Sequence, residues 1–270
     1  MIQIGNMKTH VPTIGEHTIY VGRGKDKKHM VSPGIKPHVE GWLGNPVVMN
    51  QPCIACGQVH TQGGETLLCF STLLNAKLEV NREFARAMAE LREKLSKENS
   101  VKLLCWCHPA PCHANVLLDY FEDKPLAIGF TRRMSHYAWM SNMSEHPVLM
   151  KGIFFQTAEH AYMWHKTNNE ADKARIAGAS TPEEAKKIGR TVTLREDWET
   201  VKRDVMKDVL RAKLIANPDL RIKLMITGNS PIFELTRWHD KVWGICSCQN
   251  CNFKGKNLLG KLWMELRSGC

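Results

Sequence analysis

The sequence lacks the features that direct a chain into or across a membrane. No run approaches the roughly 18 consecutive apolar residues that a membrane span requires, and the N-terminal stretch MIQIGNMKTH has no apolar signal core. No block of Lys and Arg is long enough to form a disordered basic tail, and no internal repeat is visible. We therefore expect a globular protein of the cytoplasm that has no membrane partner.

Positive charge and cysteine are the features that the sequence has in excess. The chain of 270 residues carries a net charge of +10, which favours an anionic partner such as nucleic acid, a phosphorylated metabolite or a nucleotide conjugate. A basic surface with no role in nucleic-acid binding is the alternative. Ten cysteines in a cytosolic chain favour free thiols or metal ligands over disulfides.

Two domains of different character are expected along the chain. Residues 1–123 combine β-like pieces with an amphipathic helix near 71–97, and the succession VKLLCWC, HPAP, CHANVLLDYF predicts a Cys-rich strand-turn-helix unit of an α/β domain. After a junction near 122–130, residues 130–270 should form a predominantly helical α+β domain. Capping signals such as Thr181-Pro182 and Asn217-Pro218 help to predict its helices, at about 156–168, 170–178, 182–189, 196–215, 218–226 and 257–267.

The segment FQTAEHAYMWHK, residues 155–166, pairs an acid with an amine. In a helix, Glu159 and Lys166 lie two turns apart, about 10.5 Å along the axis, and the long lysine side chain leans back toward the N-terminus. A carboxylate and an amine that face one space can act on a sugar C1 as acid or base, nucleophile or charge clamp. The alternative is an ordinary ion pair on the surface.

The C-terminal half resembles the NADAR family, also called YbiA-like, over roughly residues 130–268. The resemblance is carried by motifs in a definite order: WMSNM with Ser141-Asn142, Pro147, TAEHAYMWHK, IGR at 188–190, DWETVKRDVM at 197–206, LRAKLIANPDL at 210–220, TG at 227–228, Glu234, DKVWG at 240–244 and GKNLLGKLWMELR at 255–267. Many motifs in the same order and spacing make this resemblance specific.

The resemblance implies an N-glycosidase that cleaves a bond between ribose and nitrogen and requires no cofactor for that step. The expected substrate is ADP-ribose attached to a guanine base of nucleic acid, or a related ADP-ribosyl nucleotide conjugate. One alternative is a ribosylamino-pyrimidine phosphate of riboflavin synthesis, and another is a module that binds ADP-ribose or a nucleotide without turnover. The family also admits a phage-encoded protein that acts in the host cytoplasm.

The chemistry of the reaction assigns expected roles to three motif residues. Cleavage of a C1–N bond builds oxocarbenium character on the sugar, and Glu159 would either stabilise that charge or activate water. Lys166 would be a nucleophile that opens the sugar through a Schiff base, or a cation that holds phosphate. Asp240 would hydrogen-bond the base or the sugar hydroxyls and completes the expected catalytic set.

Further motif residues are expected to bind the substrate. Trp243, followed by Gly244, can stack on a base unless it is a core tryptophan. Other residues have side chains or backbone groups that suit sugar, base or phosphate: Ser141, Asn142, His160, Arg190 and Asn257. The alternative for these residues is a role in a turn, in helix capping or on the surface.

The sequence departs from the family pattern in two places. At the third position of the Ser-Asn motif, where the family often has an aromatic residue, this sequence has Met143, and the stretch that is usually Gly-rich reads ICSCQNCNFK. The second difference places Cys246, Cys248 and Cys251 beside the expected site. A zinc ion there would need a fourth ligand such as His239.

The N-terminal half resembles, over residues 17–121, an uncharacterised domain of phage and bacterial proteins that is sometimes fused to NADAR domains. Its signals are YVGRG, GWLGNP and CWCHPAPCHANVL. Cys112 is expected at a helix N-terminus, where the dipole would lower its pKa and make it reactive, and Arg23 could contribute to an anion site. A purely structural Cys-rich turn is the alternative.

A second N-terminal pattern predicts a structural zinc site. Cys53-Ile-Ala-Cys56-Gly has the shape of half a zinc knuckle. The two missing ligands would be His60 and Cys69, or thiolates from the cluster at 105–112.

Overall fold

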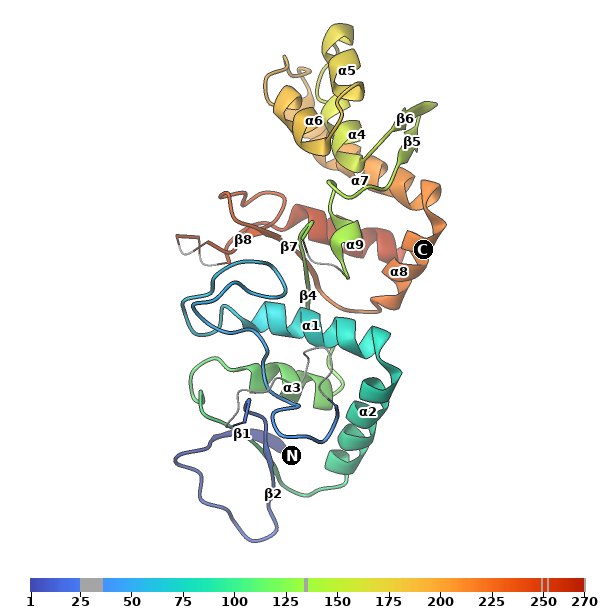
Figure 1. The fold of residues 1–270 in the computed structure, drawn as a ribbon. Helices are drawn as coiled ribbons and strands as arrows, with labels where there is room; N and C mark the ends of the chain where they lie inside the picture. The colour runs from blue at the N-terminus through green and yellow to red at the C-terminus, as the bar shows by residue number, and fades with distance from the viewer. Residues whose placement is uncertain (25–35, 134–135, 249, 252, 270) are drawn as a thin grey trace. The chain divides into compact units, whose positions relative to one another are not determined.

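The chain folds into two compact units, Met1–Gly129 and Phe130–Cys270. The computed structural model describes residues 1–24, 36–133, 136–248, 250–251 and 253–269, and Figure 1 shows the order of its elements. Both units mix helices and strands, as expected. None of the helices formed by the described residues has the length and hydrophobicity of a membrane span.

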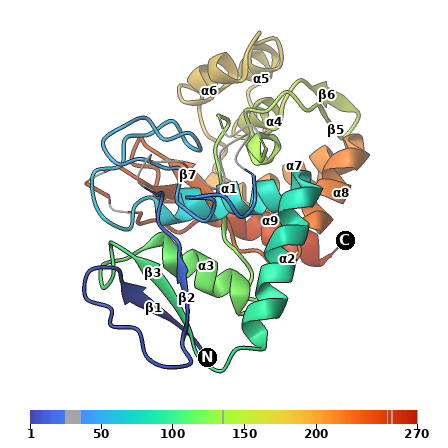
Figure 2. The ribbon, with the colours of Figure 1, turned by 60° about the horizontal axis from the view of Figure 1, so that its bottom comes forward.

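The N-terminal unit is built on a parallel sheet. Strand β3 (Val101–Cys105) lies between β1 (Ile2–Asn6) and β2 (His17–Tyr20), with Ile4 and Ile19 both opposite Leu103. Its sequence VKLLC is almost entirely apolar, which suits a central strand that is buried on both faces. Figure 2 shows α3 (His113–Phe121) beside this sheet.

Two helices replace the single helix expected at 71–97. Helix α1 (Leu67–Val80) ends at Asn81, whose extended backbone (φ −116°, ψ 97°) starts α2 (Arg82–Ser96) in a new direction. The Asn81 side chain accepts a hydrogen bond from the Phe84 amide at 2.9 Å, so it acts as an N-cap. The expectation was wrong because the apolar spacing continues through a capping residue. The core of the unit contains Phe70, Leu74, Phe84, Met88, Leu103 and Leu117.

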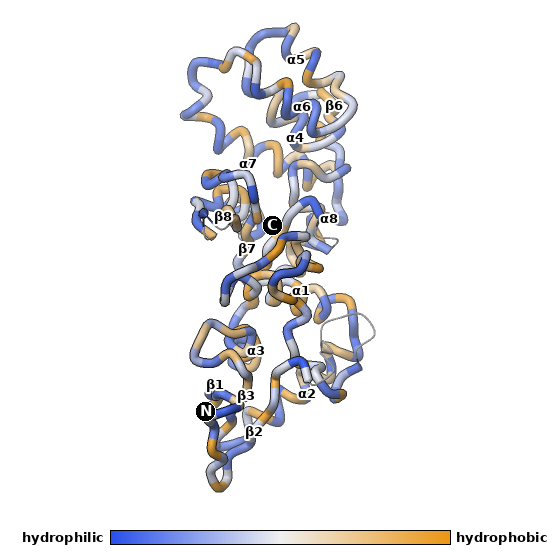
Figure 3. Tube along the Cα trace, turned by 60° about the vertical axis from the view of Figure 1, so that its left-hand side comes forward, coloured by the Kyte–Doolittle hydropathy of each residue, from blue (hydrophilic) through white to orange (hydrophobic). Residues whose placement is uncertain are grey.

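The C-terminal unit is richer in helices. Its elements are β4 (Ile128–Phe130), which crosses the unit boundary, η1 (Ala138–Met140), β5 (Val148–Met150), β6 (Ile153–Phe155), α4 (Ala158–Trp164), α5 (Glu170–Ala177), α6 (Pro182–Gly189), α7 (Trp198–Ala216), α8 (Pro218–Ile226), β7 (Ile232–Thr236), β8 (Ile245–Cys246) and α9 (Leu258–Ser268). Strands β4, β7 and β8 form one sheet in that order, and β5 pairs with β6. The mixture of hydrophilic and hydrophobic residues along the helices can be followed in Figure 3.

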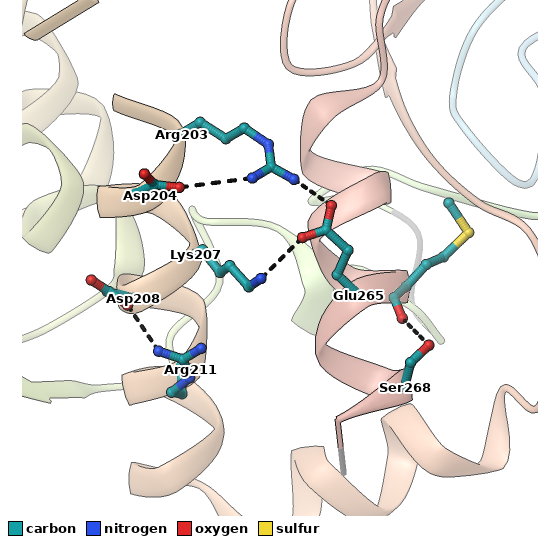
Figure 4. A network of polar contacts seen from close by, with 8 residues as sticks. Arg203, Asp204, Lys207, Asp208, Arg211, Glu265 and Ser268 are labelled. Atoms are coloured by element: carbon teal, nitrogen blue, oxygen red, sulfur yellow. Dashed lines mark hydrogen bonds and ion pairs between the residues drawn. The ribbon is translucent and has the colours of Figure 1, made fainter. Parts of the chain in front are cut away.

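Polar contacts join α7 to α9. Glu265 of α9 accepts from Arg203 and, at 3.1 Å, from Lys207, two residues that lie one turn apart on α7 (Figure 4). Below these contacts, Trp263 is fully buried and its indole donates to the Met140 carbonyl at 3.0 Å. Helix α9 is thereby joined both to α7 and to η1, which precedes β5.

Candidate active site

Helix α4 places Glu159 in its first turn. Thr157 is the N-cap, and its side chain accepts from the His160 amide. The Glu159 amide donates to the Asn142 carbonyl at 3.0 Å, which ties the start of α4 to the Ser141-Asn142 segment. A carboxylate in the first turn also suits the positive end of the helix dipole.

The Glu159 carboxylate is buried and only partly satisfied. The residue is 4% exposed, and its Oε1 has no hydrogen-bond partner among the described residues. The ammonium of Lys186 lies 3.8 Å from this oxygen, an ion pair too long to be a hydrogen bond. Burial raises the pKa of Glu159, and the charges of Lys186, Lys166 and Arg190 oppose that shift. The carboxyl group thus has a free oxygen in a cationic environment.

Lys166 reaches this environment by a turn rather than along the helix. Helix α4 ends at Trp164, so the helix expected at 156–168 is too long. The Lys166 amide bonds the Met163 carbonyl at 3.1 Å, and Nζ donates to the Gly189 carbonyl at 2.6 Å. Burial lowers the pKa of Lys166, while the neighbouring charge of Glu159 raises it. The two side chains therefore interact, although the ammonium is anchored at the end of α6.

Cations of α6 complete this part of the site. Arg190 is the exposed C-cap of the helix, and Lys186 lies one turn earlier on the same face. Sequence analysis overlooked Lys186. The spacing of four residues to Arg190 within TPEEAKKIGR was the available signal, but such pairs are common on solvated helices.

Glu234 on β7 is a second carboxyl group that sequence analysis left without a role. Its Oε2 is buried and finds no partner in the described part of the chain. Burial raises the pKa of Glu234 to about 8; Asp240 and Glu159 add to the rise and Lys186 opposes it. Glu234 is therefore largely protonated at neutral pH. The available signal in the sequence was the position of Glu234 in the series of family motifs.

Asp240 shapes the turn that follows β7. Its Oδ1 accepts from the amides of Val242 and Trp243, each at 2.9 Å, an arrangement of the Asx-turn kind. The half-buried Asp240 also lies within electrostatic reach of Glu234. The structure thus brings Asp240 near the site and shows that one of its oxygens holds the Trp243 backbone.

Aromatic rings border the carboxyl groups. Trp243 is half-buried and packs edge-on against Tyr162 of α4, with ring centroids 5.5 Å apart. Burial raises the pKa of the Tyr162 phenol, and the charge of Glu159 adds to that rise. The next residue is Gly244. A Cβ at this position would lie 2.6 Å from the Glu234 carbonyl oxygen, so the glycine allows β8 to pack closely on β7.

A buried lysine donates hydrogen bonds to the Ser141-Asn142 segment and its neighbours. Lys213 of α7 donates to the carbonyls of Trp139 and Ser141 at 2.6 and 2.9 Å and to Ser144 Oγ at 2.7 Å. Burial lowers the pKa of Lys213 to about 7. Ser141 and Asn142 are themselves buried, and Asn142 Oδ1 is an acceptor for which the described residues provide no donor.

Two residues expected to contact substrate have their side-chain polar atoms engaged within the protein. The ring nitrogens of His160 contact Thr157 Oγ1 at 2.8 Å and the Ala179 carbonyl at 3.1 Å. Asn257 donates to the Ile232 carbonyl at 2.8 Å and accepts from the Glu234 amide at 3.0 Å. These contacts fix both side chains against neighbouring elements. Their partners are distant in sequence, so the motif alone could not reveal this.

The N-terminal candidates also differ from expectation. Cys112 is the N-cap of α3, and hydrogen bonds with Cys105 and Cys107, together with burial, raise its pKa, the opposite of the direction that the dipole argument predicted. The exposed Cys107 has the lowered pKa instead, through hydrogen bonds from the same thiols. Arg23 is engaged with protein carbonyls, those of Asn45 at 2.7 Å and Val47 at 2.9 Å.

Among the described residues, thiols and imidazoles gather in groups whose ligand atoms all lie within 4.8 Å of one another. The groups are Cys53, Cys56, His60 and Cys69; His239, Cys246, Cys248 and Cys251; and Cys105, Cys107 and Cys112. For the first group, the structure selects His60 and Cys69, not the 105–112 thiols, as companions of the Cys53–Cys56 knuckle. Gly57, at φ +71°, provides the left-handed residue that closes this knuckle.

Comparison with known proteins agrees with the division of the chain. A model described as NADAR domain matches residues 122–269, and one described as Domain of unknown function (DUF4326) matches residues 5–123. "N-glycosidase YbiA" of Shigella flexneri serotype 5b is 36% identical over 159 residues, covering 58% of this chain and 95% of that protein. "N-glycosidase Npun_R5314" of Nostoc punctiforme is 33% identical over 147 residues, 53% of this chain and 91% of that protein.

"Riboflavin biosynthesis protein PYRR, chloroplastic" of Zea mays is 35% identical over 158 residues. The match covers 52% of this chain but 25% of that protein. Among solved structures, the NMR structure of the E. coli protein YbiA is 34% identical, with a TM-score of 0.48, and the match covers 54% of this chain and 84% of that one. Since the NADAR model matches residues 122–269, more than half of the sequence, the chain belongs to the NADAR family.

Proposed function

We propose that the C-terminal unit is an N-glycosidase that hydrolyses a bond between ribose C1 and a nitrogen atom. The observation that carries the proposal is the buried Glu159 carboxyl, which has cations around it and one oxygen to which none of the described residues donates a hydrogen bond. A solvated ion pair has neither feature. The names of the YbiA and Npun_R5314 relatives, both N-glycosidases, support the same reaction class.

In this mechanism the two glutamates have different roles. Glu159 acts in its ionised form, which the charges of Lys186, Lys166 and Arg190 favour against its burial, and it stabilises the positive charge that develops on the sugar and activates the attacking water. Glu234, whose raised pKa of about 8 keeps it protonated at neutral pH, delivers a proton to the departing base. Two carboxyl groups whose environments set their protonation apart are the usual arrangement for hydrolysis of a glycosidic bond.

Lys166 acts at the sugar in this proposal. As a nucleophile, its neutral amine would attack C1 in place of water and expel the base, which takes a proton from Glu234. The ribose ring would then open to a Schiff base that water hydrolyses. The lowered pKa of Lys166 increases the neutral amine fraction that this attack requires. The other role open to it is a cation that holds phosphate, together with the exposed Arg190. A Lys166→Arg variant separates the two, because arginine retains the charge but cannot form the Schiff base.

Trp243 and Asn142 hold the base and sugar. Trp243 offers a half-buried indole for stacking, worth roughly 1–3 kcal/mol per base. Asn142 Oδ1 accepts from an N–H or O–H of the substrate, which would satisfy an otherwise unpartnered buried acceptor. Asp240 contributes by fixing the Trp243 backbone.

The substrate that we propose is ADP-ribose linked to guanine, in nucleic acid or in a nucleotide conjugate. The net charge of +10 supports a polyanionic substrate over a small one. A ribosylamino-pyrimidine phosphate is the second candidate, supported by the relative named for riboflavin biosynthesis. Binding without turnover is the third; the pairing of Glu159 with Glu234 argues against it, since a binding module needs no protonated acid.

The test is a cleavage assay on DNA that carries ADP-ribosyl-guanine, followed by detection of free ADP-ribose. Glu159→Gln should lower the rate by about 100-fold or more, the usual contribution of general acid–base catalysis. Glu196→Gln, which alters an exposed glutamate, is the matched control and should retain the wild-type rate. A fully active Glu159→Gln protein would exclude the mechanism. An inactive wild type would move the assay to ribosylamino-pyrimidine phosphates.

In the N-terminal unit, the group formed by Cys53, Cys56, His60 and Cys69 is suited to a structural zinc ion. All four residues are buried, and His60 Nε2 lies 3.5 Å from Cys56 Sγ and 3.6 Å from Cys69 Sγ. The Ala55 amide donates to Cys53 Sγ at 3.3 Å, a bond that orients a thiolate for metal. This unit would recognise the nucleic acid or nucleotide conjugate.

A further inference from the structure

A second group of metal-ligand type lies in the C-terminal unit, in the segment where the sequence departs from the Gly-rich family pattern. His239 follows β7, Cys246 is the last residue of β8, and Cys248 and Cys251 lie in the loop beyond it. His239 Nδ1 is 3.2 Å from Cys251 Sγ and 3.5 Å from Cys248 Sγ. All four ligand atoms lie within 4.8 Å of one another.

These separations fit a tetrahedral zinc site. With Zn–S bonds of about 2.3 Å and Zn–N bonds of about 2.0 Å, ligand atoms at tetrahedral angles stand about 3.5–3.8 Å apart. Three thiolates and an imidazole are a donor set that selects Zn²⁺ over Mg²⁺ or Ca²⁺, which prefer oxygen ligands. Neither distance to the histidine nitrogen needs to change by more than a few tenths of an ångström to reach this geometry.

The backbone around the group is built to hold it. Cys246 pairs with Thr236 of β7, and its amide donates to the Lys254 carbonyl at 3.0 Å, so this thiol is fixed from both sides. The Cys251 amide bonds the Cys248 carbonyl at 3.0 Å in a tight turn that brings these two thiols together. His239 has φ +61°, a left-handed conformation that is uncommon for a residue with a side chain.

The group also borders the candidate active site. Trp238, which precedes His239, lies under the ammonium of Lys186 at 5.5 Å from the ring centroid. Asp240, which follows it, holds the Trp243 amide. A metal bound between His239 and the thiols beyond β8 would therefore close the segment 239–251 into a loop and fix Asp240 and Trp243 within it.

We propose that His239, Cys246, Cys248 and Cys251 bind one Zn²⁺ ion, which fixes the loop that carries Asp240 and Trp243. The ion is a positioning element, not a reactant. Metal binding itself is independent of the reaction proposed above, and only the effect on substrate affinity rests on it.

The first measurement is the zinc content of the purified full chain by elemental analysis, after extensive dialysis. Cys248→Ser is the main variant, because Cys248 is half-buried and its replacement should leave the fold intact. It should carry one zinc ion per chain fewer than the wild type. Asn250→Ser, an exposed non-ligand position of the same loop, is the matched control and should carry the wild-type amount. Equal zinc in wild type and Cys248→Ser would overturn the proposal, whether the thiols are free or oxidised.

Cobalt provides a second readout that does not depend on activity. Co²⁺ loaded into the full chain should give the absorption of tetrahedral thiolate coordination. Cys248→Ser should lose the part due to this site, and Asn250→Ser should retain it. A spectrum that Cys248→Ser leaves unchanged would contradict the site.

The positioning effect is measured by kinetics. Cys248→Ser should raise KM by about 10-fold, the lower range for altered support of a metal site, with a smaller change in kcat. An unchanged KM in a variant that has lost its zinc would show that the ion is structural only. Inactivity of the wild type would leave the zinc measurement unaffected, so the two proposals fail separately.

Discussion

The described residues contain two groups of four that could hold a metal ion, and these groups have the same donor types but different settings. In the N-terminal group every residue is buried, and Cys69 lies within α1, whose neighbours Phe70 and Leu74 belong to the core. In the C-terminal group His239 is exposed, Cys248 is half-buried, and the connecting loop carries residues of the candidate site. The same chemistry can therefore stabilise a core in one unit and shape a binding surface in the other. Substitutions should separate these two uses.

Loss of the proposed N-terminal zinc site should give the largest effect. Cys69→Ser should unfold the N-terminal unit, because structural zinc contributes about 10–16 kcal/mol in small zinc-dependent folds, more than the stability of an ordinary domain. Circular dichroism and limited proteolysis would detect this, and a fragment that begins near residue 122 should resist digestion. Ile54→Ser, an exposed change within the same knuckle, should leave the unit folded. If Cys69→Ser retains full stability, the N-terminal group is not a folding site.

In the C-terminal unit, the buried amine of Lys213 should contribute to stability. Lys213→Met should destabilise that unit by about 3 kcal/mol or more, since the Trp139 and Ser141 carbonyls lose a buried donor and each unsatisfied group costs about 1–3 kcal/mol. Arg211→Met, on the same helix, removes only an exposed pair with Asp208 and should cost less than about 1 kcal/mol. Denaturant unfolding of both variants measures the difference. Equal losses would mean that Lys213 does not support the Ser141-Asn142 segment.

Burial of Glu234 in the C-terminal unit should make both the activity and the stability of the protein depend on pH. If the protonated form is the acid, kcat/KM of the wild type should fall as the pH rises through about 8. Glu234→Gln should reduce the rate by about 100-fold and abolish that falling limb. Because the folded pKa lies above the unfolded value, the wild type should also lose stability as the pH rises toward 8, and the glutamine variant should not. A falling limb that persists in Glu234→Gln would assign the proton to another group.

The sequence was sufficient to predict some of the helices and the family. Local signals predicted α6 and α8 at 182–189 and 218–226, because Thr181-Pro182 and Asn217-Pro218 mark the helix starts through their own backbone chemistry. The motif series predicted the NADAR family. Capping at Asn81, by contrast, overrode an apolar spacing that continued through it.

Tertiary partners decided the rest of the site, and spacing could not reveal them. Lys186 and Glu234 gain importance only because α6 and β7 bring them toward Glu159. The polar side-chain atoms of Asn257 and His160 are engaged by β7 and by the Ala179 carbonyl, contacts that only the fold brings about. For Cys112, neighbouring thiols outweighed the helix dipole, an effect that depends on the approach of Cys105 and Cys107 in the fold.

The smallest effect that we predict concerns the division of labour between the units. If the N-terminal unit recognises the polyanionic substrate, the fragment 122–270, which retains β4, should show a higher KM than the full chain and nearly the same kcat. The full chain should also lose activity on nucleic acid steeply between about 50 and 200 mM salt, because each neutralised phosphate releases a counterion, and the fragment should show a shallower slope. Kinetics of both proteins at the two salt concentrations measure this. Identical slopes would place the recognition of charge within the NADAR unit, beside Lys186 and Arg190, and would leave the N-terminal unit without a role in substrate binding.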